Sequence, residues 1–365
     1  MMNVNTADIL SRFALEGTIE SVKPLGNGLI NDTYKVTTSA GAPDYVLQRI
    51  NNAIFQDVEM LQRNIEAVTR HIRAKLEAAG ESDIDRKVLR FIPLKDGSGQ
   101  TWCCIDGAYW RVSVFIPDAF TFETVDPVYS EFAGQAFGRF EAQLADIPDT
   151  LGETIPDFHN MEFRAKQLQD AIAADKAGRL AKPEVQAMLA DIQLYIEDMC
   201  LAERLYREGK LPKRICHCDT KVNNMMFDAE GHVLCVIDLD TVMPSFVFSD
   251  FGDFLRTAAN VVAEDDPAIE KVAFKKDIFE AFARGYLSSA SSFLTPVEKE
   301  NLPYGVMLFP FMQAVRFFTD YLNGDTYYKI AYPEHNWVRT RNQMALFHSV
   351  RANKDYMQAF IQKNA

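Results

Sequence analysis

The fold of this chain is decided by one stretch, Cys216-His217-Cys218-Asp219-Thr220-Lys221-Val222-Asn223-Asn224. In it an Asp lies two residues after a His, and an Asn lies five residues after that Asp. A further acidic residue, Asp238, directly follows the apolar pair Val236-Ile237. The segment 225–237 contains a Glu-Gly turn, so we expect a β-hairpin that leaves Asp238 at the exit of a buried strand.

This spacing is typical of the catalytic loop of protein kinases and of the small-molecule kinases that share their fold. Phosphoryl transfer depends mostly on positioning and on neutralising the charge of the phosphoryl oxygens. A rigid loop of this length lets Asp219 accept the proton of the attacking hydroxyl while Asn224 reaches a magnesium ion. Lys221 is expected to reach the transferring phosphoryl group, and Asp238 to hold the metal from the other side. The catalytic candidates are therefore Asp219 and Lys221, and the metal candidates are Asn224 and Asp238.

A metal site built from Cys216, His217 and Cys218 is the rival interpretation of the same stretch. It is disfavoured because these residues lie too close together and no second, spaced pair of ligands accompanies them. An isolated His-x-Asp would mark only a cap or a loop residue. The conjunction with a Lys, an Asn and a later strand that ends in an Asp favours the catalytic interpretation.

Length and charge limit the classes of function. A chain of 365 residues predicts two domains, at about 150 residues each. With 48% hydrophobic residues, both domains should be globular. The 38 basic and 51 acidic residues give a net charge of −13, which argues against nucleic acid or an anionic membrane surface as the main partner. A small-molecule substrate fits better, and the oligomeric state stays open.

Cysteine usage and hydropathy predict a cytoplasmic protein. The six cysteines lie mostly in predicted strands or beside the catalytic loop, where disulfides would distort the backbone, so a reducing compartment is expected. The segment Met1–Phe13 has no sustained apolar run of the signal-peptide kind. The most apolar stretch, Tyr304–Phe318, is too short to span a bilayer, and we interpret it as a buried helix.

The first third of the chain predicts a mostly antiparallel sheet that forms a nucleotide-binding lobe. Alternating patterns mark six strands, at 19–25, 26–37, 45–50, 88–94, 101–105 and 109–116. The second begins with a glycine turn that contains Gly26, Gly28 and Asn31, the candidates for a loop that covers the nucleotide. A pair of glycines in a hairpin is weak evidence by itself and gains meaning from the catalytic loop downstream.

The third strand lies where kinases place the lysine that contacts the nucleotide phosphates, and it contains no lysine. Gln48 occupies the equivalent position, and Arg49 should point to the opposite face. Either Gln48 acts as a neutral hydrogen-bonding group or another cation serves. Glu66, on a helix predicted over 60–76, is the candidate partner of the missing lysine, with a plain surface glutamate as the alternative. The backbone of Ile116, just before Pro117, is expected to meet the adenine edge.

From Tyr129 onward the pattern becomes helical, which predicts lobes at residues 1–116 and 117–365 with a hinge at Pro117. Aromatic and aliphatic spacing predicts helices over 132–144, 163–177 and 185–206. We interpret Asp250-Phe251-Gly252 as the start of a helix, with Asp250 or Asp253 bracing the catalytic loop from beneath. His159 is interpreted as a loop or capping residue.

These residues together resemble the aminoglycoside phosphotransferase and choline kinase-like superfamily, and within it the bacterial N-acetylhexosamine 1-kinases. The catalytic motif identifies only the superfamily, whereas C-terminal segments carry the resemblance to the sugar kinases. The segments concerned are Phe13–Gly17, Gly26–Tyr34, Asp219–Lys221, Ile237–Thr241, Asp250–Asp253, Arg316–Phe317, Asp320–Leu322, Gly324–Asp325, Tyr332–Asn336 and Arg339–Arg341.

The resemblance implies an α+β, protein-kinase-like fold of two lobes, with an antiparallel-sheet N-lobe and a mainly helical C-lobe. It implies transfer of the ATP γ-phosphoryl group, with Mg²⁺, to the anomeric hydroxyl of N-acetylglucosamine or N-acetylgalactosamine. Asp219 would be base and sugar ligand at once, and Arg316 and Tyr327 match positions that look like sugar contacts. These sugar kinases, by the same resemblance, also lack a lysine in the third strand.

Alternatives remain for Arg316 and for the acceptor. A cation in an apolar helix is unfavourable to bury without polar partners, which either a substrate cleft or an ion pair with Asp320, one turn on, would supply. The acceptor could instead be another small alcohol, such as choline, homoserine or an aminoglycoside, and an amine would call for an acidic pocket. The lack of lysine at Gln48 also leaves open a catalytically silent nucleotide-binding module.

Overall fold

The structure is a computed structural model that describes residues 6–26, 30–122 and 125–365. It divides into two compact units. The first contains the described parts of residues 1–121 together with 146–156 and 225–243, and the second contains 122–145, 157–224 and 244–365. The predicted lobes had one boundary, at residue 116, whereas the chain returns to the first unit twice. The second of these returns contains Asp238.

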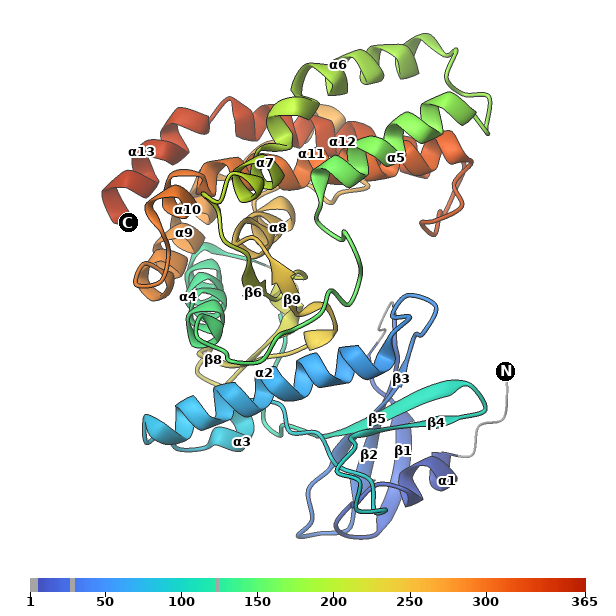
Figure 1. Cartoon of the computed structure of the whole chain (residues 1–365), viewed down its shortest axis with the longest axis vertical. Coiled ribbons are helices and arrows are strands. Elements are labelled where there is room, and N and C mark those ends of the chain that lie inside the picture. Colours follow the sequence, from blue (N-terminus) through green and yellow to red (C-terminus); the bar gives the residue numbers. More distant parts are fainter. Residues whose placement is uncertain (1–5, 27–29, 123–124) are drawn as a thin grey trace. The chain divides into compact units, whose positions relative to one another are not determined.

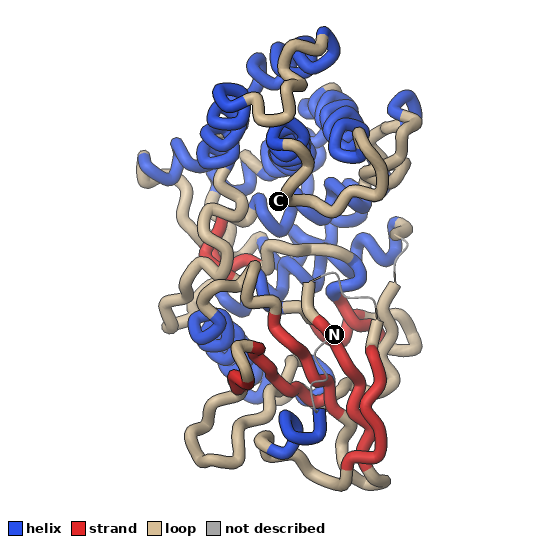
Figure 2. Tube along the Cα trace, turned by 90° about the vertical axis from the view of Figure 1, so that its right-hand side faces the viewer, coloured by secondary structure: helices blue, strands red, loops and turns tan. Residues whose placement is uncertain are grey.

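An antiparallel sheet of five strands forms the first unit, in the order β1-β2-β3-β5-β4 (Figures 1 and 2). The strands are β1 (Ile19–Pro24), β2 (Asp32–Thr38), β3 (Tyr45–Ile50), β4 (Trp102–Ile105) and β5 (Ala108–Val114). In the register of β3 and β5, Leu47 lies opposite Val112 and Gln48 lies opposite Arg111. Leu47 and Val112 belong to the hydrophobic core that also includes residues of α1 (Thr6–Ser11). Because side chains alternate along a strand, Gln48 and Arg111 lie on the other face of the sheet.

The helix predicted over 60–76 is α2 (Val58–Ala78), which is followed by the short α3 (Ile84–Lys87). Asp57 caps α2, since its side chain accepts a hydrogen bond from the amide of Met60 at 2.8 Å. Four apolar residues at helical spacing along α2 are buried, namely Leu61, Ile65, Val68 and Ile72. They determine which face of α2 points into the unit.

One predicted strand, 88–94, is wrong. The structure has only isolated bridges there, from Phe91 to Ser113 and from Leu94 to Phe13. Pro93 lacks an amide hydrogen, so the segment cannot donate at every alternate position and does not form a continuous ladder. The predicted hairpin after residue 224 is confirmed as β7 (Met225–Phe227) and β8 (Val233–Val236), and the 3₁₀ turn η2 (Leu239–Thr241) follows.

The second unit is mostly helical (Figure 1). Its helices are α4 (Pro127–Leu144), α5 (Met161–Ala174), α6 (Pro183–Met199), α7 (Leu201–Arg207), α8 (Phe248–Ala258), α9 (Lys276–Ala290), α10 (Pro296–Glu300), α11 (Leu302–Asn323), α12 (His335–Arg351) and α13 (Lys354–Asn364), with 3₁₀ turns η1 (Val222–Asn224) and η3 (Ile269–Lys271). Strand β6 (Arg214–Cys216) pairs with β9 (Met243–Ser245). The single helix predicted over 185–206 is instead two, which meet at Cys200.

A close helix contact and a buried helix build the core of the second unit. Helices α4 and α9 approach closely at glycines, because a Cβ on Gly134 would overlap the carbonyl oxygen of Phe282 and one on Gly285 that of Glu131. Helix α11 is buried along most of its length, as predicted for 304–318, and ends at Gly324 in a left-handed cap.

No helix among the described residues is long and apolar enough to span a membrane. All six cysteines are free thiols.

Candidate active site

The loop after β6 is held by Asp250, on the first turn of α8. Its two carboxylate oxygens accept hydrogen bonds from the backbone amides of His217 and Cys218, each at 2.8 Å. The hydroxyl of Thr220 donates to the backbone carbonyl of Asp250 at 2.9 Å. The predicted brace is therefore Asp250, whereas Asp253 forms an ion pair with Arg256 at 3.1 Å.

This brace holds the loop in an unfavourable backbone conformation. Cys218 has φ of 62°, in the left-handed region that residues with a Cβ rarely occupy. Such conformations persist only where surrounding contacts enforce them, and they cluster at functional sites. The hydrogen bonds to Asp250 supply that enforcement. The turn presents Asp219, the next residue, with 21% of its side chain exposed.

Asp219, Lys221 and Asn224 meet in this loop, as predicted. The ammonium of Lys221 lies 2.6 Å from Oδ1 of Asp219. The amide nitrogen of Asn224 donates to the backbone carbonyl of Asp219 at 2.8 Å and to its Oδ2 at 3.2 Å. Burial opposes the charge of Lys221, but the carboxylates of Asp219 and Asp253 more than compensate and raise its pKa. Lys221 is therefore protonated at neutral pH, and the Asp219 carboxylate is fixed from both sides.

The residues proposed as metal ligands have the oxygen donors that Mg²⁺ prefers. Asn224 is buried, and since its amide nitrogen is engaged with Asp219, its side-chain oxygen is the atom left for a cation. Asp238 lies in the first unit, directly after β8, with φ of 59° and ψ of 56°. A left-handed Asp at the end of a strand is a second strained residue within the predicted site.

A buried acidic cluster lies beneath the catalytic loop. A carboxylate oxygen of Glu141, the Sγ of Cys216 and a carboxylate oxygen of Asp250 lie within 4.8 Å of one another. Burial, and then the charge of Asp250, raise the pKa of Glu141 well above its ordinary value. The hydroxyl of Tyr286 donates to the Glu141 carboxyl group. This shift favours the protonated form of Glu141, next to the Asp250 carboxylate that holds the loop.

Glu141→Gln is expected to flatten the pH dependence of stability, because Gln mimics the protonated acid. A raised folded pKa gives stability that is complete below the ordinary pKa of 4.5 and is lost as pH rises through the folded value. Each such group contributes a slope of up to about 1.4 kcal/mol per pH unit in that window. Urea unfolding at pH values above 4.5 measures the slope. Glu184→Gln, at an exposed position of α6, is the control that should keep the wild-type slope, and an unchanged slope in Glu141→Gln would contradict this assignment.

In the first unit, an unpredicted cation occupies the sheet face where a lysine was missing. Arg111 of β5 is only 3% exposed. Its Nε donates to Oε1 of Gln48, and its Nη1 donates to Oε1 of Gln62, each at 3.0 Å. The same Nη1 lies 2.6 Å from a carboxylate oxygen of Asp240. The other oxygen of Asp240 accepts from Nδ2 of Asn31 at 2.6 Å.

Two of the residues predicted to bind the nucleotide, Asn31 and Gln48, belong to this network. Gln48 is engaged with Arg111 and, through Nε2, with the hydroxyl of Thr33 at 3.3 Å. Glu66 does not contact the cation: it accepts the hydroxyl of Thr101, and Gln62, one turn earlier on α2, reaches Arg111 instead. The residue of α2 that contacts this cation is thus Gln62, one helical turn before the predicted Glu66.

The remaining nucleotide candidates lie in turns of the first unit. Gly26 has φ of 70°, a conformation that favours glycine. Gly28 lies outside the described residues. Ile116 is buried, and the carbonyls of the next two residues, Pro117 and Asp118, accept hydrogen bonds from Arg86 at 3.3 and 3.0 Å. Arg86 therefore stabilises the backbone at Pro117 and Asp118, where the hinge was predicted.

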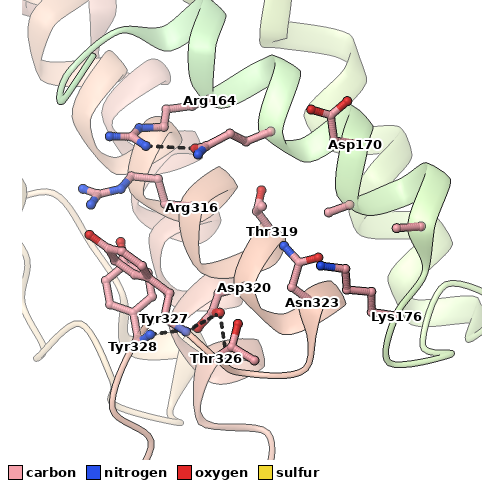
Figure 3. A pocket seen from close by; sticks show the side chains of 13 residues that line it. Arg164, Asp170, Lys176, Arg316, Thr319, Asp320, Asn323, Thr326, Tyr327 and Tyr328 are labelled. Atoms are coloured by element: carbon pink, nitrogen blue, oxygen red, sulfur yellow. Dashed lines mark hydrogen bonds between the residues drawn. The ribbon is translucent and has the colours of Figure 1, made fainter. Parts of the chain in front are cut away.

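Arg316 and Tyr327 line one pocket of the second unit, with a volume of about 390 Å³ (Figure 3). Its wall comes from α5, from α11 and from the residues that follow α11. The guanidinium of Arg316 donates to Gln313 at 3.1 Å and lies over the ring of Tyr328, 5.7 Å from its centroid. Both residues proposed as sugar contacts thus share one cavity.

The alternative for Arg316, an ion pair with Asp320, is absent among the described residues. The Asp320 carboxylate is occupied by four other donors. The backbone amides of Thr326, Tyr327 and Tyr328 donate to it at 2.9, 2.8 and 3.0 Å, and Nδ2 of Asn336 donates at 2.8 Å. Asp320 therefore fixes the loop that contains Tyr327. Arg316 is not paired with it and lines the pocket.

Comparison with known proteins identifies this architecture. The model of the family described as "Phosphotransferase enzyme family" matches residues 21–287. An aminoglycoside phosphotransferase from Alicyclobacillus acidocaldarius is similar over 98% of both chains, with a TM-score of 0.63 and 13% identity. Choline kinase from Cryptosporidium parvum covers 94% of this chain and 92% of its own, with a TM-score of 0.57 and 12% identity.

A third solved structure, spectinomycin phosphotransferase in complex with ADP and spectinomycin, covers 96% of this chain and 99% of its own. Its TM-score is 0.57 at 12% identity. At these identities the likeness shows the fold, which is the predicted α+β, protein-kinase-like one. The family match covers most of the chain, including the catalytic loop and Asp238. The chain therefore belongs to the phosphotransferase enzyme family.

Proposed function

We propose that this protein is a kinase that transfers the γ-phosphoryl group of ATP, with Mg²⁺, to the anomeric hydroxyl of an N-acetylhexosamine. One observation carries the proposal: Asp219 is presented on a strained, braced turn and fixed by Lys221 and Asn224. A base that must meet an acceptor hydroxyl in one orientation needs this kind of support. Family membership supports the reaction class.

In this mechanism, Asp219 accepts a hydrogen bond from the acceptor hydroxyl and takes its proton as the oxygen attacks the γ-phosphorus. The bond between that phosphorus and the β-phosphate oxygen breaks, and ADP leaves. Lys221 stays cationic and compensates the negative charge near the transferring group. Asn224 and Asp238 are the proposed ligands of Mg²⁺, which when bound neutralises charge on the phosphoryl oxygens. Such chemistry is mostly electrostatic, so the placing of these charges decides the rate.

For the nucleotide, the proposed contacts remain Gly26, Gly28, Asn31, Gln48, Glu66 and the backbone of Ile116. Arg111 lies on the sheet face where the lysine is missing, and its Nε donates a hydrogen bond to Gln48. Asp240, at 2.6 Å, balances the charge of Arg111, so we assign to this pair the role of holding Gln48 and Asn31 in place. The presence of Asp219, Asn224 and Asp238 disfavours a catalytically silent module.

The pocket wall favours a sugar over an amine acceptor. Three cations on it, Arg164, Arg316 and Lys176, outnumber the two carboxylates of Asp170 and Asp320, so an amine would meet net repulsion. Choline and spectinomycin, which name two of the similar structures, carry an ammonium group and amines respectively. A neutral acetamido sugar avoids this repulsion and can accept hydrogen bonds from a guanidinium through its carbonyl oxygen. The rings of Tyr327 and Tyr328 offer a face for the sugar ring.

The test is ADP release with ATP and Mg²⁺ across N-acetylhexosamines, free hexosamines, neutral hexoses, choline, homoserine and an aminoglycoside. We expect turnover of N-acetylhexosamines, with a 1-phosphate product seen by phosphorus NMR. Turnover of only another alcohol would keep the reaction class and reject the sugar assignment. ATP binding without turnover of any acceptor would favour the silent module.

A further inference from the structure

Two guanidinium groups enter the same pocket from different helices. Arg164 lies on α5 and Arg316 on α11, and Figure 3 shows their side chains next to each other at one end of the cavity. Neither forms an ion pair with a carboxylate in the part of the chain that the structure describes. Two neighbouring buried or half-buried cations without a counter-ion repel each other, so they favour binding of an anion.

Their hydrogen-bonding capacity is only partly used. Arg164 donates to Oε1 of Gln167 at 2.8 Å and to the carbonyl of Phe158 at 2.7 Å, but its Nε is buried without an acceptor among the described residues. The only acceptor of Arg316 in this part of the chain is Gln313. Burial, and then the charge of Arg316, lower the pKa of Arg164 to about 10, so both groups remain charged at neutral pH.

The two carboxylates on the wall, Asp170 and Asp320, offset only part of these charges. Asp320 is held by its four donors from residues 326–328 and Asn336, and it forms no ion pair with Arg316 among the described residues. Asp170 is paired with Lys166, at 2.8 Å on the same helix. Because Lys176 adds a third cation to the wall, three cations face two carboxylates and the pocket has an excess of positive charge.

We propose that Arg164 and Arg316 form a subsite for an oxyanion, a carboxylate or sulfate, carried by the sugar acceptor. A guanidinium presents its N–H donors in a planar fork that matches such oxyanions, and the two forks can share one anion. This inference rests on the proposed function, since it places the acceptor in this pocket. It adds a preference within that substrate class, for sugars that also have an acidic substituent.

A chain of charges connects the subsite to the catalytic loop within the same unit. Arg256 pairs with Asp253, and its charge acts on both Lys221 and His159. Burial, and then the charges of Arg316 and Arg164, lower the pKa of His159 well below its ordinary value. Direct contacts follow the same path: Nδ1 of His159 lies 3.0 Å from the hydroxyl of Ser249, the neighbour of the Asp250 that holds the catalytic loop. The carbonyl of Phe158 accepts a hydrogen bond from Arg164 at 2.7 Å, and Arg316 lies 5.5 Å from the centroid of the Phe158 ring. These contacts link the two arginines to the element that positions the loop with Asp219.

Calorimetry with the full chain tests the subsite directly. The probes are two matched pairs, galactose with galacturonate and N-acetylglucosamine with its 6-sulfate. We expect at least one acidic sugar to bind about tenfold or more tightly than its neutral partner, because charge-assisted bonds exceed neutral ones. Arg164→Gln and Arg316→Gln should each abolish that preference. Arg284→Gln, which removes an exposed arginine of the second unit outside the pocket, should keep it.

The outcomes separate this inference from the proposed function. Phosphorylation of neutral N-acetylhexosamines with no preference for either acidic partner would overturn the subsite and keep the kinase. Tighter, arginine-dependent binding of an acidic sugar without phosphorylation of any acceptor would keep the subsite and reject the kinase. Should both Gln variants fail to fold, salt decides: the preference must shrink as ionic strength rises, and a salt-independent preference overturns the subsite.

Discussion

Asp219→Asn is expected to lower the turnover number by roughly 10²–10⁴-fold, the usual contribution of a positioned general base. Asn has nearly the same shape and can still accept a hydrogen bond from the acceptor hydroxyl, but it cannot take its proton. The brace on the loop acts through the amides of His217 and Cys218, so it does not involve the Asp219 side chain. Initial rates of ADP release measure the effect, and circular dichroism checks the fold.

Asp228→Asn is the matched control. The two side chains are equally exposed, at 21%, and Asp228 also accepts backbone hydrogen bonds, from Glu230 and His232 in the hairpin turn. Its replacement should leave the turnover number within about twofold of wild type, because surface changes away from a site have small effects. Near-wild-type turnover in Asp219→Asn would show that this residue is not the base. A loss confined to KM would instead make it only a substrate ligand.

The catalytic loop was predictable because its residues are close in sequence. Asp219, Lys221 and Asn224 lie within six residues, so the backbone of one loop fixes their mutual distances. The register of β3 was equally local: alternation placed Gln48 and Arg49 on opposite faces, and Arg49 is indeed exposed and paired with Asp32. Where spacing alone determines geometry, the sequence predicts a site well.

The Arg111 network was not predictable in the same way. Asn31, Arg111 and Asp240 are brought together from distant parts of the sequence, and only the sheet and the hairpin return place them in contact. One signal was present, since Arg111 interrupts an apolar strand just as Arg316 interrupts an apolar helix. The same argument from burial of an unpaired cation would have marked both arginines.

Competition between partners explains why the alternative ion pair between Arg316 and Asp320 is absent among the described residues. Spacing of four residues on a helix favours an ion pair with Arg316, yet three backbone amides and Asn336 occupy the carboxylate. These donors come from the loop after α11, whose path a helical pattern does not reveal. Glu66 and Gln62 show the same limit, because helical periodicity alone cannot choose between residues one turn apart.

Arg111→Met is expected to destabilise the first unit by about 3–5 kcal/mol, because breaking a buried ion pair leaves an uncompensated charge. Asp240 would keep only Asn31 as a partner, and Gln48 and Gln62 would each lose a donor. Trp102 and Trp110 lie in this unit, so fluorescence of a Trp337→Phe background reports its unfolding in a urea titration.

The control variant is Arg49→Met, on the other face of the same sheet. Arg49 also pairs with an Asp, Asp32, but its side chain is 48% exposed. Solvent-exposed pairs contribute at most about 1 kcal/mol, so this variant should unfold close to the wild-type urea concentration. If Arg111→Met were as mild as Arg49→Met, the buried pair would not be the interaction that holds this face together.

The double variant Arg111→Met with Asp240→Asn separates the lost charge from the lost packing. Removing the orphaned carboxylate should restore part of the stability, since neither buried group is then charged. Asn at position 240 can still accept a hydrogen bond from Asn31, whose Nδ2 now donates to Asp240. Recovery in the double variant would show that charge balance, rather than side-chain volume, makes Arg111 necessary where the sheet lacks a lysine. Strictly additive losses would place its contribution in packing alone.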